Sequence, residues 1–428
     1  MQRNRLWRTM VTSSLAITAL TAFSLAGCGP GGNSASKVIK IGTSLAVSGG
    51  DASAQLPAQY GADLAISQNK DLGSGYTLEV VHKNYEGQSG PDANIGQADI
   101  TALQNDPQVM AVVGPFNSGV AKQEIPVANA GSGPVLISPA NTNPGLTLEQ
   151  YAQEAGVNFA ALHPAGKPNF YFRIPANDFL QGKADAQIAL TATPLKPAAK
   201  TAFVVDDNTT YGKPLADFFT QFFTQGGGTT VGTRTSITSD NLSVLPQLAS
   251  AIVASKADTV FYGGVTSQGG CKLKKALVQA GYTKPMVGGD GIATDPGCIS
   301  DAGAASVGLI ATVAAPDPST LTGDKVTKLK TDYTTFVAGK PSNDFTPYAA
   351  QSYDAAMVAI TAIKGLISAN KTVTRLAVRD AIAGLSYSGA TGNISFDANG
   401  DNAGTKVFSV YAVLPGTTTW AYQTAITY

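Results

Sequence analysis

The sequence predicts an α/β fold of two Rossmann-like lobes, each a parallel sheet flanked by helices. Strand-like and helix-like segments alternate through most of the chain, a pattern typical of parallel sheets with helices on both faces. The strand-like segments are short and continuously apolar, as strands covered on both faces should be. Two series of this kind occur. One segment of each series, 111–119 in the first and 260–270 in the second, follows the same pattern. A strand is followed by a glycine, and a serine stands four positions after the glycine, just before a helix. This weak repeat indicates two similar lobes with equivalent loops.

The first series is predicted to build lobe 1. Its strands are VIKIGTSLA, YTLEVVHKN, VMAVVG and PVLIS. Apolar residues four positions apart, Tyr60 among them, indicate the first helix, and Pro91 with Asp92 suits the start of the second. A third helix is expected to begin at Ser118. Since a helix separates each strand from the next, these strands are expected to run parallel.

The second series is predicted to build lobe 2. Its strands are KTAFVVDD, TTVGTRTSI, ADTVFYGG and KPMVG, with helices after Tyr211, over LSVLPQLASAIVAS and after Cys271. The segment 163–178 is rich in Pro and Gly, which is typical of a crossing between lobes. A second crossing is expected at 311–318, and hairpin-like strands after the helices of 347–384 require a third.

These crossings form a three-segment hinge and divide the chain into four parts. Lobe 1 is expected to consist of 38–173 and 314–390, and lobe 2 of 174–313 and 391–428.

The N-terminus carries the signals of a bacterial lipoprotein. Three arginines precede an 18-residue, mostly apolar run that ends in Leu25-Ala26-Gly27-Cys28, a lipobox. We therefore expect residues 1–27 to be a signal peptide, Cys28 to be lipidated, and 28–37 to be a flexible tether. The alternative is a membrane-spanning anchor, since 18 residues just reach across a bilayer. Six Ser or Thr residues within the run and the small-small-Cys ending favour the lipoprotein.

Charge and motif content exclude several function classes. Removal of 1–27 takes away three of the 29 basic residues and none of the 29 acidic ones, so no basic surface for nucleic acid is expected. With two histidines the chain has no HExxH site, and it contains neither a GxSxG nucleophile turn nor a phosphate-binding loop. The sequence therefore supports no enzyme, no metal and no cofactor.

Two cysteines follow Cys28, at positions 271 and 298. In an oxidising exterior an even pair predicts one disulfide, Cys271–Cys298. Two separate buried thiols are the alternative, and either arrangement is structural.

Six motifs in order carry a family resemblance. They are VVGPFNSG, PVLISPANTNPGLT, FRIPANDFLQG, VVDDNTTYG, VFYGGV and GGDGIA. With the opening strand KIGTSLAVSGG, they resemble the type I periplasmic binding proteins, in particular the leucine/isoleucine/valine-binding branch that serves ABC importers. The resemblance runs from Val38 to the C-terminus. It implies the fold of that family, an amino-acid ligand between the lobes, delivery to a membrane permease, and a monomer.

The resemblance implies that Ser118 and Thr142 hold the carboxylate of the amino acid. Ser118 opens a helix, where free amides attract an anion, and both residues follow neighbouring strands of one sheet. Taken alone, Ser118 could be a helix cap and Thr142 a turn residue. Ala140 is expected to contribute backbone groups, and Asn141 a side-chain contact.

The resemblance also implies residues for the rest of the ligand. Asp290 matches the acidic partner of the ammonium group, although the branch carries the longer Glu there; an Asp in a glycine turn is the alternative. Tyr211 matches a tyrosine that lobe 2 closes onto the ligand, and Tyr60 matches a family aromatic more loosely.

One position departs from the branch. Val265 stands where the branch has an aromatic residue, so the side-chain specificity is open, and neighbouring Thr266 is expected to line the same pocket. An amide, urea or aromatic-acid binder on the same fold is the closest alternative function. A sensory ectodomain and an extracellular hydrolase lack support in the sequence.

Overall fold

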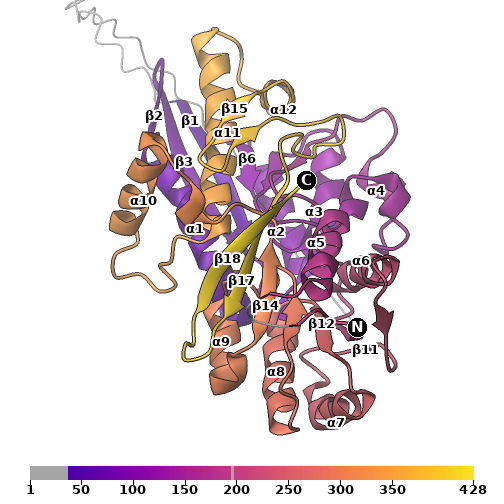
Figure 1. Ribbon diagram of the computed structural model, residues 1–428. Coiled ribbons are helices and arrows are strands. Elements are labelled where there is room, and N and C mark those ends of the chain that lie inside the picture. Colours follow the sequence, from indigo (N-terminus) through magenta and orange to yellow (C-terminus); the bar gives the residue numbers. More distant parts are fainter. Residues whose placement is uncertain (1–36, 194–196) are drawn as a thin grey trace, which may run out of the picture. The chain divides into compact units, whose positions relative to one another are not determined.

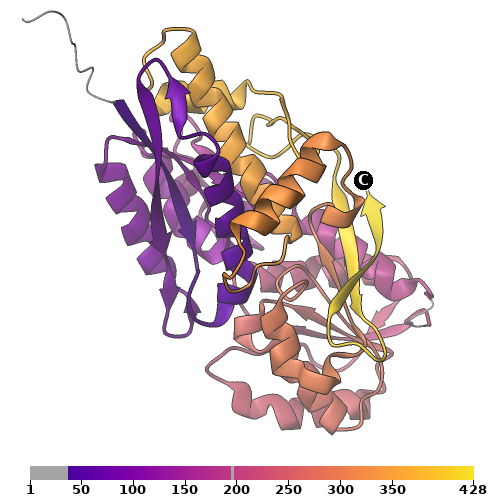
Figure 2. The same ribbon diagram turned by 90° about the vertical axis from the view of Figure 1, so that its left-hand side faces the viewer.

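The computed structural model describes residues 37–193 and 197–428. The predicted signal peptide, the lipidation site Cys28 and all of the tether except Lys37 lie outside these residues. The described residues form one compact unit. Within it the indigo-to-purple segment groups with the light-orange helices as one lobe, and the pink-to-red segment forms the other together with the yellow C-terminal hairpin (Figures 1 and 2).

Lobe 1 is built on a six-stranded sheet in the order β2-β3-β1-β6-β7-β8. Neighbouring strands are parallel except for β2 and β3, so the carboxyl ends of five strands lie at one edge. The central strands β6 and β7 are buried throughout, as their continuous apolar runs predict. The strands are β1 (Lys37–Leu45), β2 (Asp71–Gly73), β3 (Tyr76–Asn84), β6 (Val109–Val113), β7 (Val135–Ser138) and β8 (Tyr171–Arg173).

Helices from both ends of the chain cover this sheet. They are α1 (Ala52–Ser67), α2 (Ala93–Asn105), α3 (Ser118–Asn129), α4 (Phe159–Leu162), α10 (Asp324–Phe336), α11 (Pro347–Ser368) and α12 (Arg375–Ala383). The helices α1 and α11 pack closely because Gly61 has no side chain: a Cβ there would lie 2.1 Å from the Ala349 carbonyl oxygen. The second part of lobe 1 thus completes a core begun by the first.

Lobe 2 contains an eight-stranded sheet in which β10-β9-β12-β13-β14-β17-β18 are neighbours and β11 also pairs with β9. The pairs up to β14 are parallel, and the C-terminal hairpin β17–β18 adds to β14 in antiparallel fashion (Figure 1). The strands are β9 (Thr201–Asp206), β10 (Thr229–Thr230), β11 (Thr235–Ser236), β12 (Thr259–Gly263), β13 (Met286–Gly288), β14 (Leu309–Val313), β17 (Val407–Val413) and β18 (Trp420–Thr427).

The segment TTVGTRTSI differs from its prediction as one strand. It forms two short strands, β10 and β11, because Gly232 between them takes a positive φ of 72°, which ends extended pairing.

The helices of lobe 2 are α5 (Asp178–Leu190), α6 (Gly212–Gln225), α7 (Leu245–Ser255), α8 (Gly270–Gln279) and α9 (Pro296–Ala302). A disulfide between Cys271 and Cys298 joins α8 to α9, with the two Cα atoms 5.2 Å apart. The two thiols are therefore not separate.

Three crossings connect the lobes. The first lies between β8 and α5, and the second between β14 and α10. The third lies later than the predicted boundary at residue 391. Ile394 belongs to the lobe 1 core, and the ring of Phe396 packs 4.9 Å from that of Phe172. Lobe 2 therefore resumes at Val407, because apolar packing keeps residues 391–396 on lobe 1.

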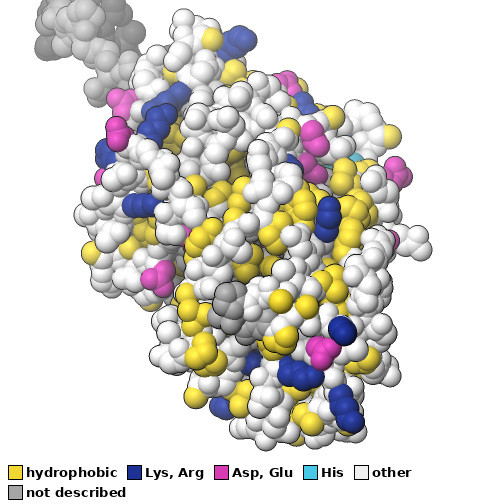
Figure 3. Space-filling view, viewed as in Figure 1, with side chains coloured by type: hydrophobic (Ala, Val, Ile, Leu, Met, Phe, Trp, Pro, Cys, Tyr) yellow, Lys and Arg dark blue, Asp and Glu magenta, His cyan; other side chains and the backbone are white. Residues whose placement is uncertain are grey.

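The outer surface carries few charges. On the face shown in Figure 3, basic and acidic side chains are scattered among uncharged ones and form no continuous basic area. Within 37–193 and 197–428, every helix is too short or too polar to traverse a lipid bilayer.

Candidate functional site

A cavity of about 130 Å³ lies between the lobes. Its walls come mostly from loops that follow strands β6, β7, β9, β12 and β13, which is where ligands of open α/β sheets bind. An apolar cavity of ~150 Å³ in another protein holds a benzene molecule, so this cavity suits a small solute. The lining residues are Pro91, Ala93, Phe116, Asn117, Ser118, Gly119, Val120, Ala140, Thr142, Thr209, Tyr211, Val265, Gln268, Asp290 and Gly291.

The N-terminus of α3 opens into this cavity. Ser118 is the first residue of the helix, and the amides of Ser118 and Gly119 have no acceptor within it, because the first turn of a helix never provides one. The preceding Asn117 does not cap them: its side-chain oxygen accepts hydrogen bonds from Tyr85 (2.9 Å) and Gln55 (2.7 Å) instead. Free amides and the helix dipole make this end an anion site.

Thr142 faces the same cavity from the loop after β7. Its hydroxyl is buried and has no hydrogen-bond partner of normal geometry among the residues described. A buried hydroxyl left in this state costs roughly 1–3 kcal/mol. A bound polar group would remove that cost, so Thr142 and the α3 amides together can hold a carboxylate.

Asp290, after β13, supplies negative charge from lobe 2. Its carboxylate accepts a hydrogen bond of 2.6 Å from the Tyr211 hydroxyl and another from the Tyr348 hydroxyl. Burial raises the pKa of Asp290, and these two hydroxyls oppose the rise. No lysine or arginine is among the described residues that line the cavity. A ligand cation would therefore be the countercharge of this carboxylate.

Asp178 is a second buried carboxyl, beside the site but outside the cavity lining, that sequence reasoning missed. It begins α5, is fully buried, and neither oxygen has a partner within the described part of the chain. Its amide donates to the Thr142 carbonyl oxygen at 2.7 Å. Burial raises the pKa of Asp178 well above its ordinary value, the charge of Asp290 adds to the rise, and the Thr142 hydroxyl opposes it. The signal was present in the motif FRIPANDFLQG, where an Asp opens the helix after a crossing.

Five of the eight predicted ligand residues lie together in the cavity. They are Ser118, Ala140, Thr142, Tyr211 and Asp290. Val265, where the sequence departs from the branch, also lines it. The cavity has apolar walls that sequence reasoning did not single out, from Pro91, Ala93, Phe116 and Val120.

The structure does not place the Asn141 side chain on the cavity, and its predicted contact with ligand stays a prediction. This side chain is fully buried away from the cavity lining. Its amide donates to the Phe116 carbonyl oxygen (2.6 Å), and its oxygen accepts from the Tyr171 hydroxyl (2.9 Å). Asn141 therefore braces the loop from behind.

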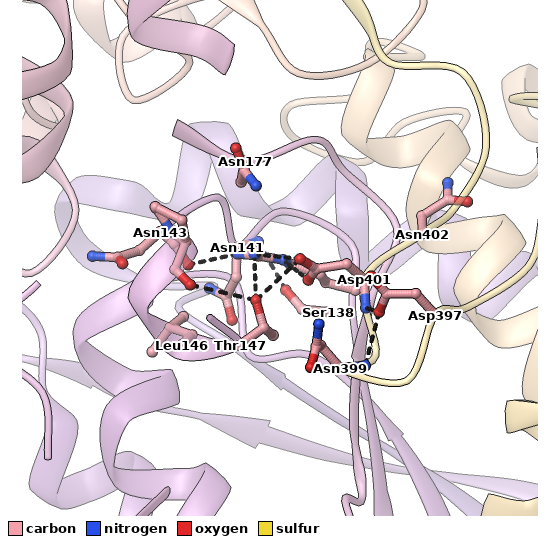
Figure 4. Close-up of polar contacts among 12 residues, drawn as sticks. Ser138, Asn141, Asn143, Leu146, Thr147, Asn177, Asp397, Asn399, Asp401 and Asn402 are labelled. Atoms are coloured by element: carbon pink, nitrogen blue, oxygen red, sulfur yellow. Dashed lines mark hydrogen bonds and ion pairs between the residues drawn. The ribbon is translucent and has the colours of Figure 1, made fainter. Parts of the chain in front are cut away.

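Much of the polar segment after β7 has the same bracing role (Figure 4). Ser138 donates to the Pro115 carbonyl oxygen at 2.6 Å. Arg173 donates to the carbonyl oxygen of Asn143 (2.6 Å) and to the hydroxyl of Thr147 (2.7 Å), and it is paired with Asp401. The Thr142 hydroxyl, in contrast, makes no hydrogen bond of normal geometry among the described residues, although it lies close enough to the Asp178 carboxyl to act on it.

Thr266 and Tyr60, two further predicted ligand residues, also lie outside the cavity lining. Thr266 is buried at the start of a turn, with its hydroxyl 3.4 Å from the Gly291 carbonyl oxygen, and its neighbour Val265 faces the cavity instead. Tyr60 packs with Tyr333 in a separate cluster between α1 and α10, and Lys340 lies over its ring. The face of α1 that carries Tyr60 points to α10 rather than to the interlobe cavity.

No three His, Cys, Asp or Glu residues are arranged to hold a metal ion in the described ranges. The chemistry that remains is reversible binding: an anion site at one side of the cavity, the Asp290 carboxylate at the other, and apolar walls between.

Comparison with known proteins decides the family. The profile of the periplasmic binding proteins matches residues 38–416. The chain belongs to this family. The membership confirms the predicted fold class and the prediction that the chain is not an enzyme. It also places the lobes outside the cytoplasm.

The curated relatives are leucine/isoleucine/valine-binding proteins. The protein is 30% identical over 183 residues to BraC3 of Rhizobium johnstonii, a match that covers 42% of each chain. It is 26% identical over 256 residues to a Leu/Ile/Val-binding protein homolog of Brucella melitensis, covering 59% of this chain and 61% of that one. The matched part thus spans less than two thirds of either relative.

Solved structures share the fold. A leucine-binding protein LivK of Thermotoga maritima has a TM-score of 0.73 and 24% identity, covering 91% of this chain and 98% of that one. LivJ of Streptococcus pneumoniae, in complex with isoleucine, has a TM-score of 0.70 and 23% identity, covering 92% and 99%. A solute-binding protein of R. palustris in complex with 4-hydroxybenzoate has a TM-score of 0.71 and 15% identity, covering 92% and 97%.

Proposed function

We propose that this periplasmic binding protein is the lipid-anchored solute receptor of an ABC importer, and that its ligand is a branched-chain or related amino acid. The observation that carries the proposal is the pairing of an anion site with the Asp290 carboxylate, which has no cationic partner among the lining residues, in one small cavity. The amides of α3 and the Thr142 hydroxyl hold the ligand carboxylate, and Asp290, with Asp178 behind it, holds the ammonium group. The relatives named for leucine, isoleucine and valine support the choice of ligand.

The apolar walls favour a small aliphatic side chain. Pro91, Ala93 and Val265 offer no charge, and the cavity of about 130 Å³ has little room beyond an amino-acid backbone and a few carbons. Val265 stands where the leucine-binding branch has a larger aromatic residue, so it leaves more room in the part of the cavity that would hold the ligand side chain. Closing the lobes around the ligand buries both of its charges, which is tolerated because each has a partner.

An aromatic acid is the second candidate, because a related fold binds 4-hydroxybenzoate. The carboxyls at the site argue against it. A ligand without an ammonium group would leave Asp290 and Asp178 buried without countercharge, which raises their pKa and weakens binding.

The test is calorimetric titration of the purified, ligand-stripped protein against the twenty amino acids, urea, short amides, benzoate and 4-hydroxybenzoate. We expect submillimolar or tighter binding of leucine, isoleucine or valine and none of the acids that lack an amino group. Binding confined to benzoate or an amide would refute the amino-acid assignment while leaving the fold unaffected.

Lipidation and delivery need separate measurements. Mass spectrometry of the protein from its native membrane is expected to find acyl chains on Cys28, and Cys28→Ser should release the protein from the membrane fraction. Loss of leucine uptake by cells lacking the gene would support the importer role, and unchanged uptake would count against it.

Thr142 gives a sharp test of the carboxylate site. We expect Thr142→Val to weaken leucine binding by roughly 10- to 100-fold, because a hydrogen bond to a charged group contributes about 1.5–3 kcal/mol. Thr142→Ser is the matched control, since it keeps the hydroxyl and should bind within a few-fold of wild type. Equal affinity in the valine and serine variants would remove Thr142 from the site.

A further inference from the structure

The rim of the cavity is a close contact between the lobes. A turn of lobe 2, Thr266–Gln268, lies beside two segments of lobe 1, the turn Gly49–Asp51 and the hairpin of β4 (Glu86–Gly87) and β5 (Gly90–Pro91). The Gln268 amide donates to the Ser89 carbonyl oxygen at 3.2 Å. A Cβ on Gly50 would lie 3.2 Å from the Ser267 Cβ. The lobes are thus closed onto each other at this rim.

Asp51 lies at the centre of this contact and has no countercharge. It is 4% exposed, and its Oδ2 atom makes no hydrogen bond to any residue in the described ranges. Ser267 of lobe 2 is close enough for its hydroxyl to stabilise the carboxylate, although no hydrogen bond of normal geometry joins them.

Other carboxyls face Asp51 from the elements around it. Glu86 comes from β4 in lobe 1, and its Oε1 atom accepts a hydrogen bond from the Gly50 amide (3.0 Å). Asp295, just before α9 in lobe 2, accepts from the Ser53 hydroxyl across the lobes (2.6 Å). Glu86 Oε2 and Asp295 Oδ2 have no partner among the described residues either.

Cations are missing from this cluster. The remaining titratable neighbours that feel the charge of Asp51 are the tyrosines Tyr85 and Tyr262, which are neutral. No lysine, arginine or histidine of the described chain is among the groups that act on Asp51. Closing the lobes with all three carboxyls ionised would therefore bury an uncompensated charge.

We propose that closure of the two lobes takes up a proton at Asp51, so that capture of the solute tightens as the external medium becomes more acidic. Opening the hinge separates Asp51 and Glu86 of lobe 1 from Ser267 and Asp295 of lobe 2, and it returns Asp51 to water. The solute in this inference rests on the proposed function, whereas the closure itself does not.

The direction of the pH effect follows from the two states of Asp51. Burial raises the pKa of Asp51 to about 7 in the closed form, the Ser267 hydroxyl opposes the rise, and Glu86 and Asp295 add to it. In the open form an exposed Asp ionises near its ordinary value of about 4. Between pH ~4 and ~7 the closed form therefore holds a proton that the open form lacks, and lowering the pH favours closure. Above pH ~7 Asp51 is ionised in both forms, and closure carries the full penalty.

The experiment compares wild type with Asp51→Asn at pH 8.0 and pH 5.5. Leucine titrations give the ratio of the wild-type Kd to the variant Kd. We expect this ratio to be about 30-fold larger at pH 8.0 than at pH 5.5, because closure of wild type takes up a proton below pH ~7 and asparagine has no charge to neutralise. Any pH dependence of leucine binding that arises from Asp290 cancels in this ratio, since wild type and variant both carry Asp290. A ratio that does not change with pH, or a variant that binds more weakly at pH 8.0, would overturn the proposal.

A second readout does not depend on the ligand. Small-angle X-ray scattering of ligand-free protein should show wild type more compact at pH 5.5 than at pH 8.0, and Asp51→Asn equally compact at both. Asp324→Asn, at an exposed position opening α10, is the matched control and should behave as wild type. If leucine does not bind but scattering follows this pattern, the proposed solute fails and the proton-linked closure holds. Scattering that is the same at both pH values in wild type would refute the closure itself.

Discussion

Replacement of Asp290 by alanine is expected to weaken leucine binding by about 30-fold or more. Removing one partner of a buried charge pair costs about 2–5 kcal/mol or more, since the ligand ammonium group is left buried without its countercharge. Tyr211 and Tyr348, which now donate to Asp290, also lose their acceptor. Calorimetry of the variant measures the loss.

Two controls separate charge from shape in this experiment. Asp290→Asn keeps the size of the side chain but not its charge, so it should lose nearly as much affinity as the alanine variant. The second control changes the ligand instead: 4-methyl-2-oxopentanoate, which is leucine with a carbonyl in place of the amino group, should bind poorly to wild type. If the asparagine variant binds leucine as wild type does, Asp290 does not hold the ammonium group, and Asp178 becomes the candidate.

The second large effect is expected on stability. Asp401→Ala should lower the free energy of unfolding by about 3–5 kcal/mol, because it leaves a buried arginine unpaired. Arg173 is fully buried; its Nε atom lies 2.6 Å from Asp401 Oδ1, and its Nη2 atom lies 3.2 Å from Oδ2. Urea unfolding measures the change.

The pH dependence of this pair is opposite in sign to that of Asp51. Burial alone would raise the pKa of Asp401, but Arg173 outweighs it and holds the pKa below its usual range. The pair therefore contributes its full stability above pH ~4 and loses it as the pH falls further.

The double variant Arg173→Met with Asp401→Leu is expected to recover part of the stability, because apolar residues of similar volume avoid both buried charges. Lys328→Ala, which breaks an exposed pair with Asp332 on α10, is the matched control and should cost no more than about 0.5 kcal/mol. If Asp401→Ala lowers the free energy of unfolding as little as Lys328→Ala does, the Arg173–Asp401 pair does not stabilise the contact between the third crossing and β8.

The pattern of the chain predicted where the site should lie, and the packing decided which side chains reach it. Ser118 and Thr142 follow neighbouring parallel strands, so topology alone brings them together. Asn141 has the same kind of side chain and a neighbouring position, yet it faces Tyr171 behind the loop. A difference of one residue reverses the direction of a side chain, and composition carries no information about that direction.

Asp178 and the third crossing also show that packing decides what the pattern of the chain leaves open. Asp178 stands in a quoted motif, but its importance rests on having no partner once α5 is packed against Thr142 and Asp290. The third crossing follows Ile394 and Phe396 rather than preceding them, because their side chains found apolar partners on lobe 1.

The sequence by itself determined the alternation of strands and helices, the two lobes and the order of the site loops, because buried parallel strands need apolar runs and their connections need helices. It also determined that Ser118, Thr142 and Asp290 lie at strand ends that face one cavity. Only the tertiary structure decided that Asn141, Thr266 and Tyr60 turn away and that Asp178 is left without a partner. The closure of the two lobes likewise brings Asp51 together with carboxyls more than 30 residues away in sequence. These outcomes depend on which groups remain unpaired after packing, and pairing between distant segments exists only in the folded chain.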